Sequence, residues 1–235
     1  MGKQTVDIVR ELVESLTFTF NIDSIVDNGD GTYTLNGCKT YQLQAMPNCT
    51  IEIGGLPYTI TNVEHNESIT ITGNPIPTVN SFTVPAPFYF HGTVIQTNLE
   101  LSQIEFFDRI PMVYLLEVLE DNYNNNSEIP LDRESSLRLF FLTNADFTDW
   151  KTSDHYKNAV LPMRNLADSF IHALNGNKFI DNFDNYTLIN RVNFGVYTTD
   201  KGYTQQIFND NLSGVEMQVT LPILPEFRCD EKCPC

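Results

Sequence analysis

One stretch of sequence sets the architecture: Ser135-Ser136-Leu137-Arg138-Leu139-Phe140-Phe141-Leu142. Polar and apolar side chains alternate at its start and its end is wholly apolar, as in a strand that becomes buried on both faces. Thr152 then begins the strongest helix pattern of the chain, which stops at Asn175-Gly176, and Pro162 should bend that helix. Its apolar stripe consists of Tyr156, Val160, Met163, Leu166, Phe170 and Leu174. A buried strand that leads into an amphipathic helix favours an α+β layer fold.

Further elements extend this pattern in both directions. Strands are predicted at Phe88–Leu101, Met112–Leu119, Tyr186–Tyr197 and Val215–Ile223 from their content of β-branched and large apolar residues. Polar loops are expected at Glu120–Pro130 and Thr198–Leu212. A short opening helix is indicated by apolar residues at three- and four-residue spacing, namely Val6, Val9, Leu12, Val13 and Leu16. We therefore expect an antiparallel sheet with helices packed on one face.

A small all-β module is predicted between the opening helix and these strands. The spacing becomes two from Thr17 onward, and Asp27-Asn28-Gly29-Asp30-Gly31 reads as a hairpin turn, because later calcium ligands are missing. Short strands should follow around Tyr41–Leu43, Ile51–Ile53, Tyr58–Val63 and Ile69–Ile71. Even spacing of this kind predicts a compact barrel or sandwich, which Pro75–Pro87 connects to the second region.

The sequence thus divides into four parts. Residues 1–16 are the N-terminal helix of the α+β domain, 17–80 the inserted β-module, 81–224 the α+β domain and 225–235 a Cys-rich tail.

Charge excludes one large class of function. The 235 residues include 14 Lys and Arg against 30 Asp and Glu, a formal net charge of −16. Binding of duplex DNA or RNA needs a basic face that neutralises phosphates. Within residues 17–80 the only Lys or Arg is Lys39, which also argues against an oligonucleotide-binding barrel. An acidic wall would instead let a polyanion pass without sticking.

The chain shows no sign of secretion or membrane insertion. The N-terminus turns polar where a signal peptide would carry its apolar core, and Pro, Asn and Thr interrupt the charge-free stretch Ser68–Leu99. The five cysteines are an odd number at only two places, which disfavours a disulfide framework. We expect a reducing, cytosolic setting.

Signatures of enzymes are missing, so neither catalytic residues nor a cofactor are predicted. There is no Gly-rich phosphate loop, no Gly-x-Ser-x-Gly elbow and no His-Glu-x-x-His motif. His155 and His172 share a helix but lie too far apart to chelate one metal, and they are interpreted as surface or helix-face residues. Asp146, Asp149 and Asp154 surround Trp150 before that helix, where capping explains a carboxylate better than acid–base chemistry.

The C-terminal tail is the one cluster with possible metal or redox content. Its thiols are Cys229, Cys233 and Cys235. They lack the paired Cys-x-x-Cys spacing of structural zinc sites, so no metal is predicted there and these cysteines stay weak candidates.

Several strings of the second half resemble structural proteins of tailed bacteriophages. They are Ser136–Leu142, Asp149-Trp150, Asp154-His155-Tyr156, Val160–Leu166, Phe170-Ile171 and the closing Leu212–Ile223. The resemblance is to head–tail joining proteins, which comprise neck-ring, stopper, tail-completion and tail-terminator families. Among these, the strings are most similar to those of Bacteroidetes-infecting, crAss-like phages. It covers about Phe88–Ile223 and the opening helix, whereas the β-module departs from the minimal tail-terminator layout.

This resemblance implies a non-enzymatic virion protein, assembled in the host bacterial cytoplasm, that forms a ring of six or twelve copies around the DNA channel. Its implied partners are further copies of itself and adjacent portal, neck or tail proteins, while DNA passes without sequence-specific binding and no membrane is involved. Loops long enough to reach a neighbour supply the candidate interface residues, namely Asp121, Asn122, Tyr123, Asn124, Asn125, Asn126, Arg133, Asp200, Lys201 and Tyr203.

Two other classes of function stay open. One is a phage accessory module that binds carbohydrate or protein through the β-module, although few of its aromatic residues are free to stack on sugars. The other is a hydrolase that uses the carboxylate-rich surface. No sequence motif supports this alternative.

Overall fold

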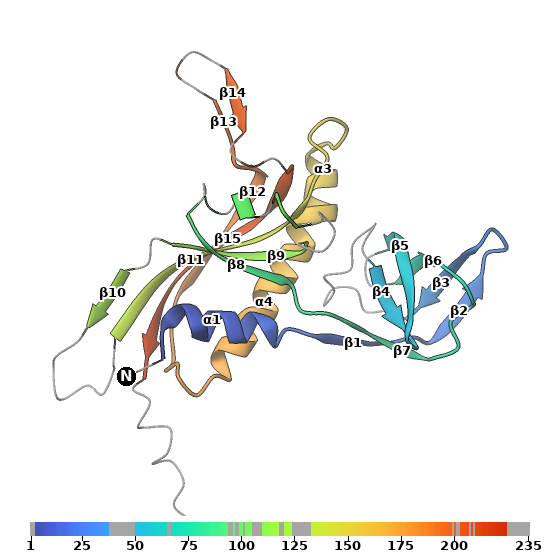
Figure 1. Cartoon of the computed structure of the whole chain (residues 1–235), viewed down its shortest axis with the longest axis horizontal. Helices are drawn as coiled ribbons and strands as arrows, with labels where there is room; N and C mark the ends of the chain where they lie inside the picture. Colours follow the sequence, from blue (N-terminus) through green and yellow to red (C-terminus); the bar gives the residue numbers. More distant parts are fainter. Residues whose placement is uncertain are drawn as a thin grey trace, which may run out of the picture.

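The computed structural model describes residues 3–37, 50–64, 67–93, 96, 99–100, 102–104, 110–117, 120–123, 133–198, 200, 203–206, 208 and 210–224. They form an α+β fold with two main sheets, both largely antiparallel (Figure 1). The sheet that contains the two longest strands is here called the larger sheet, and it carries the helices. The other, here called the smaller sheet, has more strands, most of them short, and is formed by the chain between the first helix and the larger sheet. The coarse prediction of an α+β fold is therefore confirmed.

The larger sheet is built around two long central strands. β11 (Arg133–Asn144) and β15 (Leu212–Ile223) pair antiparallel over their whole length, from Arg133 opposite Ile223 to Asn144 opposite Leu212. The strand order is β12-β15-β11-β9-β8, where the outer strands are β12 (Tyr186–Phe194), β9 (Met112–Leu116) and β8 (Phe88–Gly92). The short β10 (Glu120–Tyr123) also pairs with β11.

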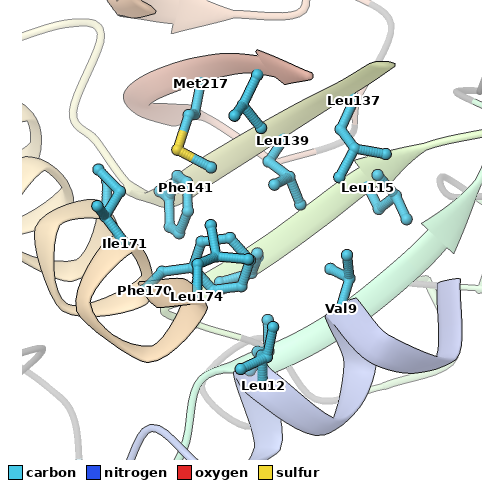
Figure 2. Close-up of a cluster of buried hydrophobic side chains, with 14 of the residues drawn as sticks. Val9, Leu12, Leu115, Leu137, Leu139, Phe141, Phe170, Ile171, Leu174 and Met217 are labelled. Atoms are coloured by element: carbon cyan, nitrogen blue, oxygen red, sulfur yellow. The ribbon is translucent and has the colours of Figure 1, made fainter. Parts of the chain in front are cut away.

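Two helical segments cover one face of this sheet. One is α1 (Thr5–Glu14) and the other runs through α3 (Thr152–His155), the π-helical turn η3 (Tyr156–Val160) and α4 (Leu161–Asn175). Figure 2 shows the apolar side chains that meet between these layers. Those labelled in the figure are Val9 and Leu12 of α1, Phe170, Ile171 and Leu174 of α4, and Leu115, Leu137, Leu139, Phe141 and Met217 of the strands.

The helix predicted from Thr152 to Asn175 is present, as α3, η3 and α4 in direct succession. The backbone forms the π-helical turn η3 just before Pro162, and the proline lies in the first turn of α4. A proline inside a continuous helical stretch has no N–H to donate to the preceding turn, and its ring crowds the carbonyl four residues earlier. The wider π turn thus accommodates the proline within one helical stretch.

The smaller sheet is a single curled sheet of seven strands. Its order is β1-β7-β4-β5-β6-β3-β2, and the strands are β1 (Phe18–Asn21), β2 (Ser24–Asp27), β3 (Thr32–Asn36), β4 (Thr50–Ile53), β5 (Leu56–Glu64), β6 (Ser68–Thr72) and β7 (Ser81–Val84). Inward side chains from six of these strands form one apolar cluster, in which Phe20 stacks on Phe82 at 5.2 Å between ring centroids. Because side chains from the same face of these strands contact one another across the cluster, the sheet has to curl around them. The predicted hairpin turn between β2 and β3 is confirmed by their antiparallel pairing.

Several predicted elements have different bounds. Ser81–Val84, expected within the connector, is strand β7 and pairs with β1, so the smaller sheet extends four residues beyond residue 80. The strand expected over Phe88–Leu101 ends at Gly92, and it runs parallel to β9, because the long connection between them lets the chain return to the same end. Part of the loop expected at Glu120–Pro130 is strand β10. The strand expected at Tyr41–Leu43 lies outside the described residues.

Candidate interaction surface on the larger sheet

The face of the larger sheet opposite α1 and α4 is here called the outer face. Because side chains alternate along a strand, Leu137, Leu139 and Phe141 point to the helices while Arg138 and Phe140 point to the outer face. The apolar cluster on the outer face contains no residue of α1 or α4. This face is therefore the side of the larger sheet that those helices leave for other contacts.

A buried carboxylate organises the middle of the outer face. Glu216 of β15 is fully buried, and Arg138 of β11 donates to its Oε1 from Nε and Nη2, both at 2.8 Å. Arg191 of β12 donates to Oε2 from Nε at 2.6 Å and from Nη2, and Gln218 Nε2 donates to Oε1 at 2.6 Å. The guanidinium of Arg138 also lies 5.6 Å from the ring centroid of Phe140. This group, here called the Glu216 clamp, joins three adjacent strands.

The clamp keeps its carboxylate charged. Burial alone would raise the pKa of Glu216, but hydrogen bonds from Arg138, Gln218 and Arg191 outweigh burial and hold the pKa below its ordinary value. The side chains of Arg138 and Arg191 are 47% and 39% exposed. Two cations around one carboxylate leave a local positive charge at the surface of a strongly acidic chain.

An aromatic hollow of about 430 Å³ opens on one side of the clamp. Its floor is formed by Tyr114, Phe140, Phe194 and Phe208, whose successive ring centroids lie 4.8 to 6.4 Å apart. Tyr114 is fully buried and donates its hydroxyl hydrogen bond to the carbonyl of Gly92 at 2.8 Å. Arg138, Arg191 and Val192 line the hollow as well.

A polar hollow of about 980 Å³ lies on the other side of Arg138. It is lined by Ser136, Gln218 and Thr220 from the strands and by residues 181–187. Four carboxylates line it against one arginine, namely Glu120, Glu134, Asp181 and Asp184. The two hollows thus differ in chemistry, and the clamp separates them.

A hairpin projects away from the sheet next to the aromatic hollow. It consists of β13 (Val196–Thr198) and β14 (Thr204–Gln206) (Figure 1). β14 lies within the loop Thr198–Leu212 that was expected to reach outward, whereas β13 covers the end of the strand predicted at Tyr186–Tyr197. Gly195 starts the hairpin at φ +77°, and a Cβ at this position would come within 2.6 Å of the Phe208 ring. Only glycine suits that backbone and that contact, so the root of the hairpin is fixed against the aromatic floor.

The predicted interface residues fall in two places. Asp200 and Tyr203 lie at the tip of the hairpin, where both are exposed and Tyr203 is 70% exposed. Asp121, Asn122 and Tyr123 lie on β10, where Asn122 and Tyr123 are exposed and Asp121 is half-buried. Asn124, Asn125, Asn126 and Lys201 lie outside the described residues, as do Cys229, Cys233 and Cys235.

Arg133 differs from the other candidates because its side chain is 2% exposed. Its Nη2 donates to the Lys3 carbonyl at 2.7 Å and to Thr5 Oγ1 at 3.1 Å, and its Nε lies 3.7 Å from Asp121 Oδ1. Ser135 Oγ and Thr5 Oγ1 lie 2.8 Å apart in the same network. The guanidinium of Arg133 therefore binds the start of α1 to the sheet of the same chain.

Asp146, Asp154 and His155 have structural partners near the start of α3. Asp154 caps its helix, since its Oδ2 accepts from the Lys151 backbone N–H at 2.9 Å, and Asp146 Oδ1 accepts from the backbone N–H groups of Thr148 and Asp149. Those two bonds lower the pKa of Asp146. His155, expected on the surface or on a helix face, lies on α3 and is buried: it is edge-on to Trp150 at 5.4 Å between centroids, and its Nδ1 is 3.5 Å from Ser213 Oγ.

Within the described ranges, no three His, Cys, Asp or Glu side chains are placed to hold a metal ion. No helix in the same part of the chain is long and apolar enough to cross a membrane.

Sequence reasoning missed the clamp. The available signal was the alternation in Val215–Ile223, which places the charged Glu216 on the same face of the strand as Gln218 and Thr220. Arg138 and Arg191 could be matched to it only through the strand register. Compared with known proteins, the chain matches no protein-family model, no curated protein and no solved structure.

Proposed function

We propose that this protein is a structural subunit of a closed homo-oligomeric ring at the head–tail junction of a tailed bacteriophage. In this proposal the larger sheet and its helices form a tail-terminator-like domain, and residues 18–84 form an inserted module. The ring surrounds the DNA channel and contacts adjacent portal, neck or tail proteins.

The observation that carries the proposal is the projecting hairpin of β13 and β14 (Figure 1). A ring needs a contact in which one patch of a subunit meets a different patch of the next subunit. A hairpin with a fixed root supplies a reaching patch, and the outer face supplies a separate receiving patch. The net charge of −16 suits a wall past which DNA must slide.

The first experiment measures assembly. Light scattering after size-exclusion chromatography of the full chain, alone and with the portal, neck and tail proteins encoded beside it, should give a particle several times 26.8 kDa. Negative-stain images should show rings with a central hole. A particle of 26.8 kDa under all of these conditions would contradict the proposal.

The second experiment tests the position in the virion. Gold-labelled antibodies against this protein should bind particles of the encoding phage between head and tail. Labelling along the tail fibres, or none on intact and partly disrupted particles, would exclude the head–tail junction.

A further inference from the structure

We propose that the aromatic hollow receives the hairpin tip of a second copy of this chain, with Tyr203 entering the hollow and Asp200 pairing with Arg191. This inference rests on the proposed ring and assigns its subunit contact.

The chemistry of the hollow defines what it can bind. Its volume of about 430 Å³ is within the range of small ligand pockets, about 300–1,000 Å³. The floor is aromatic, which favours an aromatic or apolar group through ring–ring contacts. The half-exposed guanidiniums of Arg138 and Arg191 favour a carboxylate beside that group.

The hairpin tip has the matching chemistry. Tyr203 supplies an aromatic ring that is 70% exposed, and Asp200 supplies an exposed carboxylate three residues before it. Tyrosine is among the side chains that anchor protein interfaces, because it buries a large area with few rotatable bonds. The tip therefore offers the two groups that the hollow is suited to bind.

The occupant has to come from another subunit. Figure 1 shows β13 and β14 projecting away from the larger sheet, so this pair of strands leads away from the hollow at its own root. Gly195 and Phe208 fix this direction, and both also line the hollow.

Docking of this kind has a defined polarity. The tip of one hairpin would press on Phe194 and Phe208 at the root of the next hairpin. The two patches are different surfaces of one subunit, so each copy can give one contact and receive one. A series of such contacts closes into a ring if the rotation between neighbours allows it.

The test uses two defective variants that complement each other. The tip variant carries Asp200→Lys and Tyr203→Ala and keeps its hollow. The hollow variant carries Val192→Trp, which fills the hollow from a side chain that is 43% exposed. Each variant alone should run as a monomer, and an equal mixture should form a dimer and nothing larger, because only one productive contact exists per pair.

Matched controls separate docking from general damage. Val26→Trp changes a valine that is 47% exposed on the smaller sheet, and Tyr156→Ala changes a tyrosine that is 50% exposed on η3. Both controls should assemble like the unmodified chain. Near-UV circular dichroism and urea midpoints check folding, and Val192→Lys replaces Val192→Trp if the latter does not fold.

The outcomes distinguish this contact from the ring itself. If the unmodified chain assembles and both defective variants assemble equally well, the ring stands and the hollow is not its contact. If both variants are monomeric but their mixture stays monomeric, the tip and the hollow are not partners of each other. If the unmodified chain never assembles, alone or with its virion neighbours, the proposed function fails and this contact fails with it.

Discussion

Glu216 is fully buried on β15, and Arg138 on the adjacent strand donates to its Oε1 from Nε at 2.8 Å. Arg191 approaches the other carboxylate oxygen from β12, so one anion holds two cations that are both partly exposed. The stability of the outer face should depend on this carboxylate.

Replacement of Glu216 by Gln should lower the free energy of unfolding by about 1–3 kcal/mol, because two arginines lose their charged acceptor. Urea unfolding at neutral pH measures the change. Glu134→Gln on the same face of β11 is the matched control, and it should shift stability by less than about 0.5 kcal/mol. Equal stability of the two variants would show that the clamp contributes nothing.

The contribution of Glu216 should also depend on pH. Its pKa is lowered in the folded state from an ordinary value of 4.5, so the unfolded chain takes up this proton first as pH falls. The stability difference between the unmodified chain and Glu216→Gln should be constant above about pH 5 and shrink below the ordinary pKa. Urea titrations across this range measure it. A difference that grows on acidification would contradict the lowered pKa.

Arg133→Ala should weaken folding, and not only assembly. The change leaves the carbonyl of Lys3 and the hydroxyl of Thr5 without their buried donor, at a cost of about 2 kcal/mol or more. Hydrogen exchange should become faster in α1. Arg10→Ala, which removes an exposed pair with Asp7 on the same helix, should cost less than about 0.5 kcal/mol. Unchanged exchange in α1 of Arg133→Ala would mean that the network does not anchor the helix.

The purified protein should not bind duplex DNA. Repulsion from a net charge of −16 acts on nearly every approach, and about 0.1 M salt screens it only beyond about 10 Å. Fluorescence anisotropy of a labelled duplex should stay flat as protein is added. A rise that weakens with added salt would contradict the expectation of an acidic, non-adhesive channel wall.

Truncation after Phe227 should leave the melting temperature unchanged. The last strand ends at Ile223, and Cys229, Cys233 and Cys235 follow in sequence without an apolar period that could join a core. Melting curves of the intact and truncated chains, with and without a chelator, measure this. A large drop on truncation or chelation would indicate a structural metal site in the tail. Unchanged melting with weaker assembly would assign the tail to docking.

Elements with strong periodicity were predictable from sequence. The strand at Ser135–Leu142 and the helix from Thr152 to Asn175 carry enough apolar residues at the right spacing for local pattern to identify them. Strands β7 and β10 were missed because they are short, and β10 is polar as well. Their conformation is fixed by partners far along the chain, for example Asp121 opposite Ser135 in β11.

The candidate surface was only partly predictable. The outward reach of the loop Thr198–Leu212 followed from its polar composition, but the hollow at its root did not. Phe140, Phe194 and Phe208 are brought together by sheet register and by the turn at Gly195, neither of which leaves a local signature. The same register brings Arg138 and Arg191 to Glu216 from the two neighbouring strands and so creates the clamp.

The pairing of β1 with β7 places Phe18 directly opposite Val84. The chain therefore leaves the helix-covered part of the fold and returns to it at adjacent points. The entropy lost in bringing these two points together is offset by strand pairing within the smaller sheet. Because Phe18 and Val84 are paired, the two ends of residues 18–84 lie side by side. A different module or a short turn could therefore connect these ends without displacing α1 or β8.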